Sequence, residues 1–280
     1  MNTVATLSRL FASIQADIDR ADTTFQERAA SELAILNSAS MYALESQGKR
    51  LRTAITLLSG KFNNYRLDKL LLLSVAFEMV HLATLIHDDI VDEAATRRDK
   101  PTVNTLWGNK IAILLGDYYF AKTAGLIADI DDSRITQLFS DTVAAVCEGT
   151  ILEMTTVGHI DLTVEAYYKK IEYKTASLIA GCAKGGAILS QSSNEEIELL
   201  YSYGINLVSL SSLLTIFSIT LRINQLLVNL LVMTCAREWS PCRSFMLCKM
   251  LHSTVVSRKY RVCLTDRSKK KRIYERWSPG

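Results

Sequence analysis

The amino-acid sequence predicts an all-α protein, and three of its features lead to that prediction. Of its 280 residues, 49% are hydrophobic, which is enough for one large core or two small ones. It contains only 3 prolines and 12 glycines, so few positions interrupt long helices or supply the turns of a β fold. Apolar residues also recur at helical spacing along most of residues 1–189. A bundle of helices is therefore the expected architecture.

The clearest helix prediction is Asp68–Glu93, which is apolar nearly all round, as expected for a helix inside a bundle. Glu78, His81 and three aspartates interrupt its apolar run within the length that a membrane span needs, which argues against a span. Further helices are expected at residues 1–26, at Val103–Ala128 after an RRDKPT loop, from Ser133 onwards, at Asp161–Ser190 and at Ile197–Leu207. Ser193 and Glu196 form a capping box ahead of the last of these helices.

Charge and cysteine are distributed unevenly along the chain. Residues 1–207 carry 19 Lys and Arg against 26 Asp and Glu, a balance of −7, whereas residues 208–280 carry 13 against 3, a balance of +10. Two of the 6 cysteines lie in the first part and the other four in the second. So few cysteines in the first part suit a reducing compartment, and residues 1–26 lack the continuous apolar core of a signal peptide. We therefore expect a cytoplasmic protein.

Three aspartates end the long apolar helix, in the stretch LIHDDIVDEAATRRDKPT at residues 85–102. Asp88 and Asp92 are four residues apart and Asp89 and Asp92 three, so the carboxylates are expected on one helical face. At 4 Å and an effective dielectric constant of 20, each like-charged pair costs about 4 kcal/mol, which a divalent cation would offset. Hard oxygen ligands of this kind favour Mg²⁺.

This stretch has a plainer alternative, because a lone DxxD pattern is more often a solvated acidic helix end with ordinary surface ion pairs. Here, however, Arg97 and Arg98 follow the aspartates at once, and more basic residues stand upstream in GKRLR at Gly48–Arg52. Arginine supplies bidentate donors of fixed charge, which suit a phosphate group. The combination favours a site for a divalent cation and a phosphorylated ligand.

These residues give the chain a resemblance to the trans-isoprenyl diphosphate synthases, the polyprenyl synthetase family. Four motifs stand in the order and spacing of that family: GKRLR at Gly48–Arg52, HDDIVDEAATRRDKPT at His87–Thr102, LLGDYYFAKT at Leu114–Thr123 and YKTASL at Tyr173–Leu178. The resemblance covers roughly residues 1–207 and implies an isoprenoid-synthase-like helical bundle. It also implies the reaction, in which an allylic diphosphate ionises, the double bond of isopentenyl diphosphate attacks the carbocation, and a proton is lost.

The resemblance further implies which residues form the site. The Mg²⁺ ligands on the allylic diphosphate would be Asp88, Asp89 and Asp92, helped by Arg97. The residues that grip isopentenyl diphosphate would be Lys49, Arg52, His81 and Arg98. Lys174 and Thr175 would contact the allylic diphosphate from the facing helix, and Lys174 is grouped with the three aspartates as catalytic. Two alternatives stay open, because a histidine on a buried helix is often a core residue and a threonine can bond back to its own helix.

Product length is predicted from the residues one turn before the aspartates. Ala83 and Thr84 are small at positions where short-chain family members carry aromatic residues. An open cavity floor there implies a long product, of six or more isoprene units. The alternative is that small residues at these positions only let neighbouring helices approach closely.

The C-terminal part departs from the family pattern. The family continues with a second aspartate cluster in a pattern like YGxxLGxAFQxxDDxxD, whereas this chain reads YGINL at Tyr203–Leu207 and then VSLSSLLTIFSI. If one nucleotide was lost near codon 208, codons can be chosen so that Val208–Leu221 recovers GLAFQLIDDILDYT, with aspartates at Thr215, Ile216 and Ile219. The same shift turns Leu227–Leu251 into LGKPAGNDLREGMVTLPVVYALQDA. We therefore predict a polyprenyl synthetase domain at 1–207, incomplete at its C-terminus, and an out-of-frame tail at 208–280.

The predicted function is that of a long-chain polyprenyl diphosphate synthase, a prenyltransferase, with little or no activity in this chain because the second cluster is missing. The alternative is a non-catalytic subunit of a hetero-oligomeric prenyl synthase. The uncharged run Leu199–Leu221 and the basic RSKKKRIYER segment would suit a membrane anchor or nucleic acid, but out-of-frame sequence has no designed role. We therefore expect no nucleic-acid partner and no designed membrane span, and the family resemblance implies a homodimer.

Overall fold

The computed structural model describes residues 11–45, 50–156 and 163–212, apart from the side chain of Val164, and all of them belong to one compact unit, Met1–Leu214. Lys49 lies outside the described residues. So do residues 213–280, which include most of the predicted out-of-frame tail and the three positions at which the shifted frame would place aspartates.

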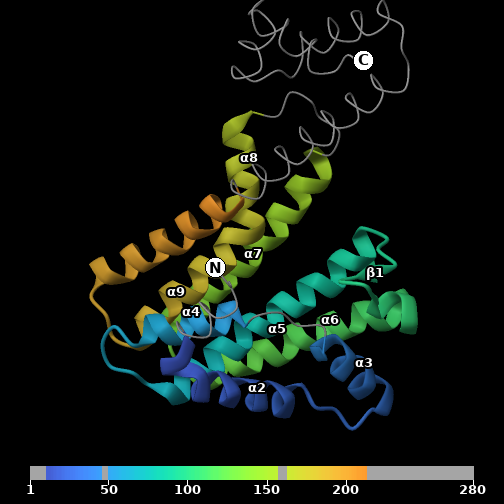
Figure 1. Cartoon of the computed structure of the whole chain (residues 1–280), viewed down its shortest axis with the longest axis horizontal. Helices are drawn as coiled ribbons and strands as arrows, with labels where there is room; N and C mark the ends of the chain where they lie inside the picture. The colour runs from blue at the N-terminus through green and yellow to red at the C-terminus, as the bar shows by residue number, and fades with distance from the viewer. Residues whose placement is uncertain (1–10, 46–49, 157–162, 213–280) are drawn as a thin grey trace, which may run out of the picture. The chain divides into compact units, whose positions relative to one another are not determined.

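The described part of the chain is almost entirely helical, as predicted (Figure 1). Its first helices are η1 (Ala12–Ile14), α2 (Gln15–Ala29), α3 (Ala34–Glu45), α4 (Leu51–Gly60) and α5 (Leu67–Val91). After two short strands come α6 (Val103–Ile130), α7 (Ser133–Thr156), α8 (Val164–Ile171), the π-helical turn η2 (Glu172–Ala176) and α9 (Ser177–Leu189). Residues 194–212 are also helical.

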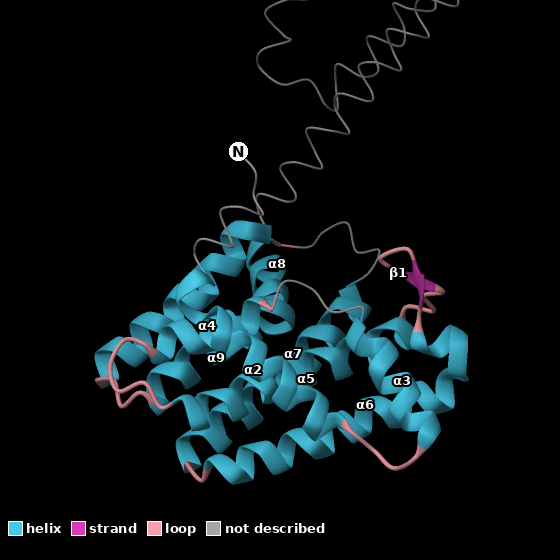
Figure 2. Ribbon diagram, turned by 60° about the horizontal axis from the view of Figure 1, so that its bottom comes forward, coloured by secondary structure: helices cyan, strands magenta, loops and turns pink. Residues whose placement is uncertain are grey.

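Helix α5 is the centre of the bundle, as its all-round apolar sequence predicts. It packs against α6, α4, α2 and α9, and Figure 2 shows it surrounded by other helices. Leu70, Leu73, Phe77 and Met79 have no exposed surface, so successive turns are buried on every side. Because α5 is held on all sides, the aspartates at its C-terminal end are presented from a rigid support.

The RRDKPT segment differs from the predicted loop, because it forms a small antiparallel hairpin. Strand β1 (Thr96–Arg97) pairs with β2 (Lys100–Pro101), and Arg97 is opposite Lys100. The two turn residues, Arg98 and Asp99, both have positive φ, at 51° and 64°. This left-handed backbone at both positions is that of a type I′ turn, which is common in two-residue hairpins. The hairpin therefore turns Arg97 back towards the end of α5.

The predicted helix at 161–190 is interrupted by a π-turn, which the sequence did not reveal. Thr163 caps α8 by accepting a hydrogen bond from the backbone N–H of Ala166 at 3.2 Å. The chain then passes through η2 into α9, and Lys174 lies within the π-turn. Insertions of this kind are frequent at functional sites because they reorient side chains within a helix.

The helix at residues 194–212 packs against α9. The predicted capping box is confirmed, because Ser193 Oγ accepts from the N–H of Glu196 at 3.3 Å while the Glu196 carboxylate accepts from the N–H of Ser193 at 2.8 Å. A Cβ atom at Gly204 would lie only 2.6 Å from the Cα of Ala180, so glycine permits this close approach. The last described residues are thereby directed along α9 towards the π-turn.

Two described helices, α5 and α6, are long and apolar enough to cross a membrane, by length and composition alone. The most apolar part of α5 is 67% buried inside the fold, which is the pattern of a core helix, whereas the corresponding part of α6 is 39% buried. Leu106, Ile113 and Leu114 are exposed on α6.

Candidate active site

The three aspartates at the end of α5 have different surroundings. Asp89 is buried. Its Oδ1 atom accepts a hydrogen bond at 2.8 Å from Nε of Arg97 on β1 and forms an ion pair at 2.8 Å with Nη2 of the same arginine. Asp88 is half-buried and faces the π-turn, while Asp92 is exposed and is the C-cap residue of α5. Asp88 and Asp89 thus have different partners, while the charge of Asp92 acts to raise the pKa of both. The expectation that all three carboxylates share one face stays a prediction.

Asp88 faces Lys174, whose Nζ atom lies 3.7 Å from its Oδ2 atom. The same ammonium donates a hydrogen bond to the carboxylate of Glu153 on α7. Lys174 thus joins the ends of three elements: α5, α7 and the π-turn. The sequence analysis placed Lys174 opposite the aspartates but missed Glu153. No short motif marks a carboxylate that meets its partner 21 residues later on another helix.

The ionisation of these groups follows from their burial. Burial raises the pKa of Asp88, and the nearby Lys174 only partly offsets this effect. Burial likewise raises the pKa of Asp89, against the hydrogen bond from Arg97. For Lys174, burial alone would lower the pKa, but the hydrogen bond to Glu153 and the charge of Asp88 outweigh it, so the pKa is raised. The lysine is therefore a fixed positive charge beside Asp88.

The carboxylates of Asp88 and Asp92 could bind a divalent cation together with a phosphorylated ligand. They lie one helical turn apart, and Mg²⁺ is usually bound by one or two carboxylates together with water and substrate phosphates. Within the described residues, no group of three or more His, Cys, Asp or Glu side chains is placed to hold a metal ion. The described carboxylates therefore fit a divalent cation shared with a phosphorylated ligand, and do not form a closed protein cage.

The predicted phosphate-binding residues gather around His81. Burial, helped by the positive charges of Arg52, Arg97 and Arg98, lowers the pKa of His81 to about 2. His81 is consequently neutral at physiological pH. The structure thus brings together four of the predicted residues from α4, α5 and the hairpin, while Lys49 lies outside the described residues.

Arg52 belongs to this basic group but lacks a full set of partners. Its Nε atom is buried and has no hydrogen-bond partner among the described residues. Burial lowers its pKa, and the charge of Glu78 opposes that shift. Glu78 is itself buried on α5 and accepts hydrogen bonds from the N–H and hydroxyl of Thr53 at 3.3 and 3.2 Å. A buried arginine N–H without an acceptor is the group that an anionic ligand would satisfy.

Arg50 has a structural role that the sequence analysis missed. It precedes α4 with a left-handed backbone, φ 52°, and its Nε atom lies 2.7 Å from Oδ1 of Asp22 on α2. This ion pair ties the GKRLR segment to the first described helices and fixes the direction in which α4 and Arg52 begin.

Thr175 is exposed at the π-turn, and its hydroxyl makes no hydrogen bond with the described residues. Its neighbour Ser177 behaves differently, donating to the carbonyl of Tyr173 at 2.6 Å. The alternative that Thr175 only bonds back to its own helix is therefore not what the structure shows. The hydroxyl remains available to a ligand beside Lys174.

The GDYY motif on α6 packs against the residue that precedes the aspartates. A Cβ atom at Gly116 would overlap the ring of His87, so glycine is required for this contact. Nε2 of His87 lies 3.1 Å from the carbonyl oxygen of Ile113 and 3.7 Å from Oδ1 of Asp117. The motif therefore positions the last turn of α5 through contacts with His87.

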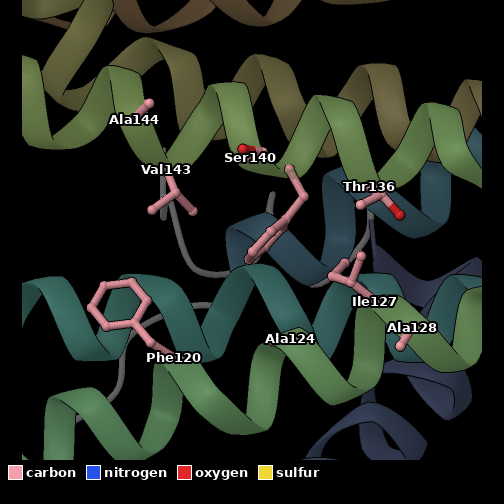
Figure 3. Close-up of a pocket in the computed structure, with 9 residues that line it drawn as sticks. Phe120, Ala124, Ile127, Ala128, Thr136, Ser140, Val143 and Ala144 are labelled. Carbon is pink, nitrogen blue, oxygen red and sulfur yellow. The ribbon is translucent and has the colours of Figure 1, made fainter.

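An apolar cavity of about 580 Å³ lies between α6 and α7, with Phe120, Ile127 and Val143 directed into it (Figure 3). Its lining residues are Phe120, Ala124, Ile127, Ala128, Thr136, Phe139, Ser140, Val143 and Ala144. The ring of Phe120 lies 5.9 Å from that of His87, which places one end of the cavity close to the aspartates.

The two residues used to predict product length do not line this cavity. Ala83 is fully buried in the core, and the hydroxyl of Thr84 donates to the carbonyl of His81 at 2.8 Å. The small residues on this cavity are instead alanines and a serine from α6 and α7, which the sequence analysis did not single out.

Comparison with known proteins agrees with this geometry. Residues 33–209 match the Polyprenyl synthetase family. Component 2 of a heptaprenyl diphosphate synthase from Bacillus subtilis (strain 168) is 33% identical over 194 residues, which are 69% of this chain and 56% of that protein. The octaprenyl diphosphate synthase of Escherichia coli (strain K12) is 30% identical over 188 residues, which are 67% of this chain and 58% of that enzyme.

Two solved structures have the same fold. A decaprenyl diphosphate synthase from Rhodobacter capsulatus superimposes with a TM-score of 0.69 at 32% identity, and covers 71% of this chain and 61% of its own. A polyprenyl synthase from Caulobacter crescentus CB15, complexed with calcium and isoprenyl diphosphate, gives a TM-score of 0.69 at 28% identity with the same coverage. The chain thus spans less than two thirds of the length of these relatives. With its motifs placed on the corresponding helical bundle, the chain belongs to the polyprenyl synthetase family.

Proposed function

We propose that this chain derives from a long-chain polyprenyl diphosphate synthase, which joins isopentenyl diphosphate head to tail to an allylic diphosphate. One arrangement carries the proposal: Asp88 faces Lys174, and two turns earlier on α5 His81 lies among three arginines. Two neighbouring sites with different charges suit two diphosphates that must be bound at once. Relatives named heptaprenyl and octaprenyl diphosphate synthases support products of six or more isoprene units.

The allylic diphosphate is assigned to the aspartate side. Asp88 and Asp92 would hold Mg²⁺, which when bound neutralises the charge that develops on the leaving diphosphate. Lys174 and the hydroxyl of Thr175 would bind the same group from the π-turn. Arg97 contacts only Oδ1 of Asp89, so Asp89 would position that arginine and could still offer Oδ2 to the cation.

Isopentenyl diphosphate is assigned to the basic group around His81. Arg52 offers a buried N–H without an acceptor, and Arg98 and Lys49 add positive charge. His81 remains uncharged at physiological pH, so its contribution is a hydrogen bond and not a charge. A diphosphate needs several donors, and three arginines near one another repel unless an anion joins them.

The growing chain is assigned to the cavity between α6 and α7. The cavity is apolar, begins near His87 and is within the usual volume range of small-molecule sites. An apolar wall also excludes water, which would otherwise capture a carbocation.

The positions of the second aspartate cluster, Thr215, Ile216 and Ile219, lie outside the described residues. That this chain has lost the cluster is therefore part of the proposal. We expect this chain, as written, to turn over isopentenyl diphosphate and an allylic primer with Mg²⁺ at a barely detectable rate. A version with GLAFQLIDDILDYT at Val208–Leu221 and LGKPAGNDLREGMVTLPVVYALQDA at Leu227–Leu251 should gain activity of at least a hundredfold. Enzyme-like turnover by the chain as written would refute the predicted loss, and an inactive replacement that still folds would refute the assignment.

A second candidate is a subunit that functions with a different partner chain. The relatives named component 2 of heptaprenyl diphosphate synthases, from Bacillus subtilis and Geobacillus stearothermophilus, favour this possibility by their names. Co-expression with a tagged full-length homologue would decide it: co-purification in fixed ratio, with activity above that of the homologue alone, supports a subunit.

A homodimer is the partner expected from the family, and the exposed apolar side chains of α6 support it. Leu106, Ile113 and Leu114 are 48%, 43% and 61% exposed on a helix whose other side packs on α5. Analytical ultracentrifugation of Leu114→Lys should then show a monomer. The control Leu199→Lys, at an equally exposed leucine on the last described helix, should leave the dimer intact.

The proposal includes a cytoplasmic location, no nucleic-acid partner and no designed membrane span. Carbonate extraction of the expressed chain tests the last point, since an integral span resists extraction and a peripheral protein does not.

A further inference from the structure

The ammonium of Lys174 is shared unequally between two carboxylates. It donates a hydrogen bond to Glu153, whereas its distance to Oδ2 of Asp88 is 3.7 Å, beyond hydrogen-bond range. All three side chains are partly shielded from solvent, with exposed fractions of 26% for Lys174, 38% for Glu153 and 18% for Asp88. Glu153 thus accepts the hydrogen bond from the lysine, whereas Asp88 interacts with its positive charge but accepts no hydrogen bond from it.

The backbone contact one turn earlier on α7 fixes this arrangement. A Cβ atom at Gly149 would overlap the backbone N and Cα atoms of Lys174, so α7 touches the π-turn directly at that point. Gly149 and Glu153 are four residues apart and lie on the same face of α7. The glycine sets the distance between the two elements, and Glu153 then meets the lysine side chain from the same face.

We propose that Glu153 is a positioning residue that holds Lys174 off Asp88, so that the oxygens of Asp88 stay open to a divalent cation. The inference rests on the proposed function, because it concerns the cation that the aspartates would bind. Glu153 belongs to neither the aspartate motif nor the YKT motif. Its hydrogen bond with Lys174, which joins α7 to the π-turn, would thereby have a function in cation binding.

Competition explains why such a residue is needed. An ammonium and a divalent cation both bind carboxylate oxygens, so a lysine that paired fully with Asp88 would have to be displaced before a cation could bind. Without the Glu153 carboxylate, Asp88 becomes the nearest acceptor for Lys174, and a charge-assisted hydrogen bond forms there. The lysine and the cation would then exclude each other at Asp88.

The experiment measures Mn²⁺ binding to the full chain in the presence of inorganic diphosphate, from the loss of the free-ion EPR signal against protein-free blanks. The variants are Glu153→Gln, Lys174→Met and the two combined. Glu148→Gln is the matched control, because it removes the same charge from the same helix at an exposed position, and Glu148 is not among the ion-pair partners of Lys174 in the described part of the chain. Circular dichroism verifies that each variant is folded.

Glu153→Gln should weaken Mn²⁺ binding about tenfold, whereas Glu148→Gln should change it less than twofold. In the Lys174→Met background, Glu153→Gln should have no more effect than Glu148→Gln, because no lysine is left to occupy Asp88. The inference is overturned if Glu153→Gln matches Glu148→Gln in the original background, or if its effect persists undiminished with Lys174→Met. A wild-type chain that binds no Mn²⁺ with diphosphate contradicts the proposed function itself, and the inference falls with it.

Discussion

Arg97 holds Asp89 through two nitrogen atoms, Nε and Nη2, that both lie 2.8 Å from the same carboxylate oxygen. Asp89 is buried at the end of α5, and Arg97 comes from the hairpin that follows it. This pair connects the metal-binding side of the proposed site to its basic side, since Arg97 also lies near His81. A single arginine thereby fixes the positions of two elements that carry predicted ligands.

Arg97→Ala should destabilise the fold by about 2 kcal/mol, because it leaves the buried Asp89 carboxylate without its charge-assisted donor. The measurement is urea unfolding followed by circular dichroism. Arg134→Ala is the control, because Arg134 donates to Asp132 with similar geometry, at 3.1 and 2.8 Å, but at an exposed position. Its loss should cost under about 1 kcal/mol. Equal losses for the two variants would contradict a structural role for the Arg97 pair.

Gly149→Ala should destabilise the fold by about 2 kcal/mol, because the added methyl group overlaps the backbone at Lys174 and forces α7 away from the π-turn. Gly125→Ala is the matched control, since a Cβ atom there meets nothing within 4 Å. In the interior of α6 that change should instead stabilise by about 0.5–1 kcal/mol. Thermal unfolding of both variants measures the difference, and a stabilising effect at both positions would show that the contact is not tight.

His81 should make the fold less stable as the pH falls below its unfolded pKa. Its pKa is about 2 in the folded protein and 6.5 as a model value, so between these values the unfolded chain binds a proton that the folded chain does not. Stability is therefore fully present above pH 6.5 and is lost towards pH 2. Between pH 7 and pH 5.5 the loss from this group is about 1 kcal/mol. Urea unfolding of His81→Gln should lack that part of the loss, and an unchanged pH dependence would show that His81 is protonated in the fold.

Ala124→Phe should shorten the product in the version of the chain with the restored C-terminal sequence, because Ala124 lines the cavity between α6 and α7. A phenyl ring there would fill space assigned to the later isoprene units. Ala121→Phe is the control, as it stands three residues earlier at an exposed position that does not line the cavity. Chromatography of the dephosphorylated products measures chain length. The cavity assignment is wrong if both variants make the same products as their parent.

The sequence predicted the helical class, the central helix and its aspartates because these depend on neighbours close along the chain. The run Asp68–Glu93 is apolar on every face, and the structure has α5 at Leu67–Val91. The capping box of Ser193 and Glu196 is equally local and is confirmed. The π-turn at Lys174 could not be predicted, because the helical periodicity of Asp161–Ser190 continues across it. The turn packs against Gly149 of α7, a contact between segments that are distant in the sequence.

By itself, the sequence determined which residues this protein has available for a metal and for phosphates: the aspartates of α5, the arginines of the hairpin and Lys174. Only the tertiary structure decided how they are paired. Asp89 belongs with Arg97 and Lys174 belongs first with Glu153, and neither pairing follows from spacing along one helix. The physical reason is that each residue's charge and hydrophobicity can be read directly from the sequence. The partner of a buried charge instead depends on which distant helix comes within about 3 Å of it.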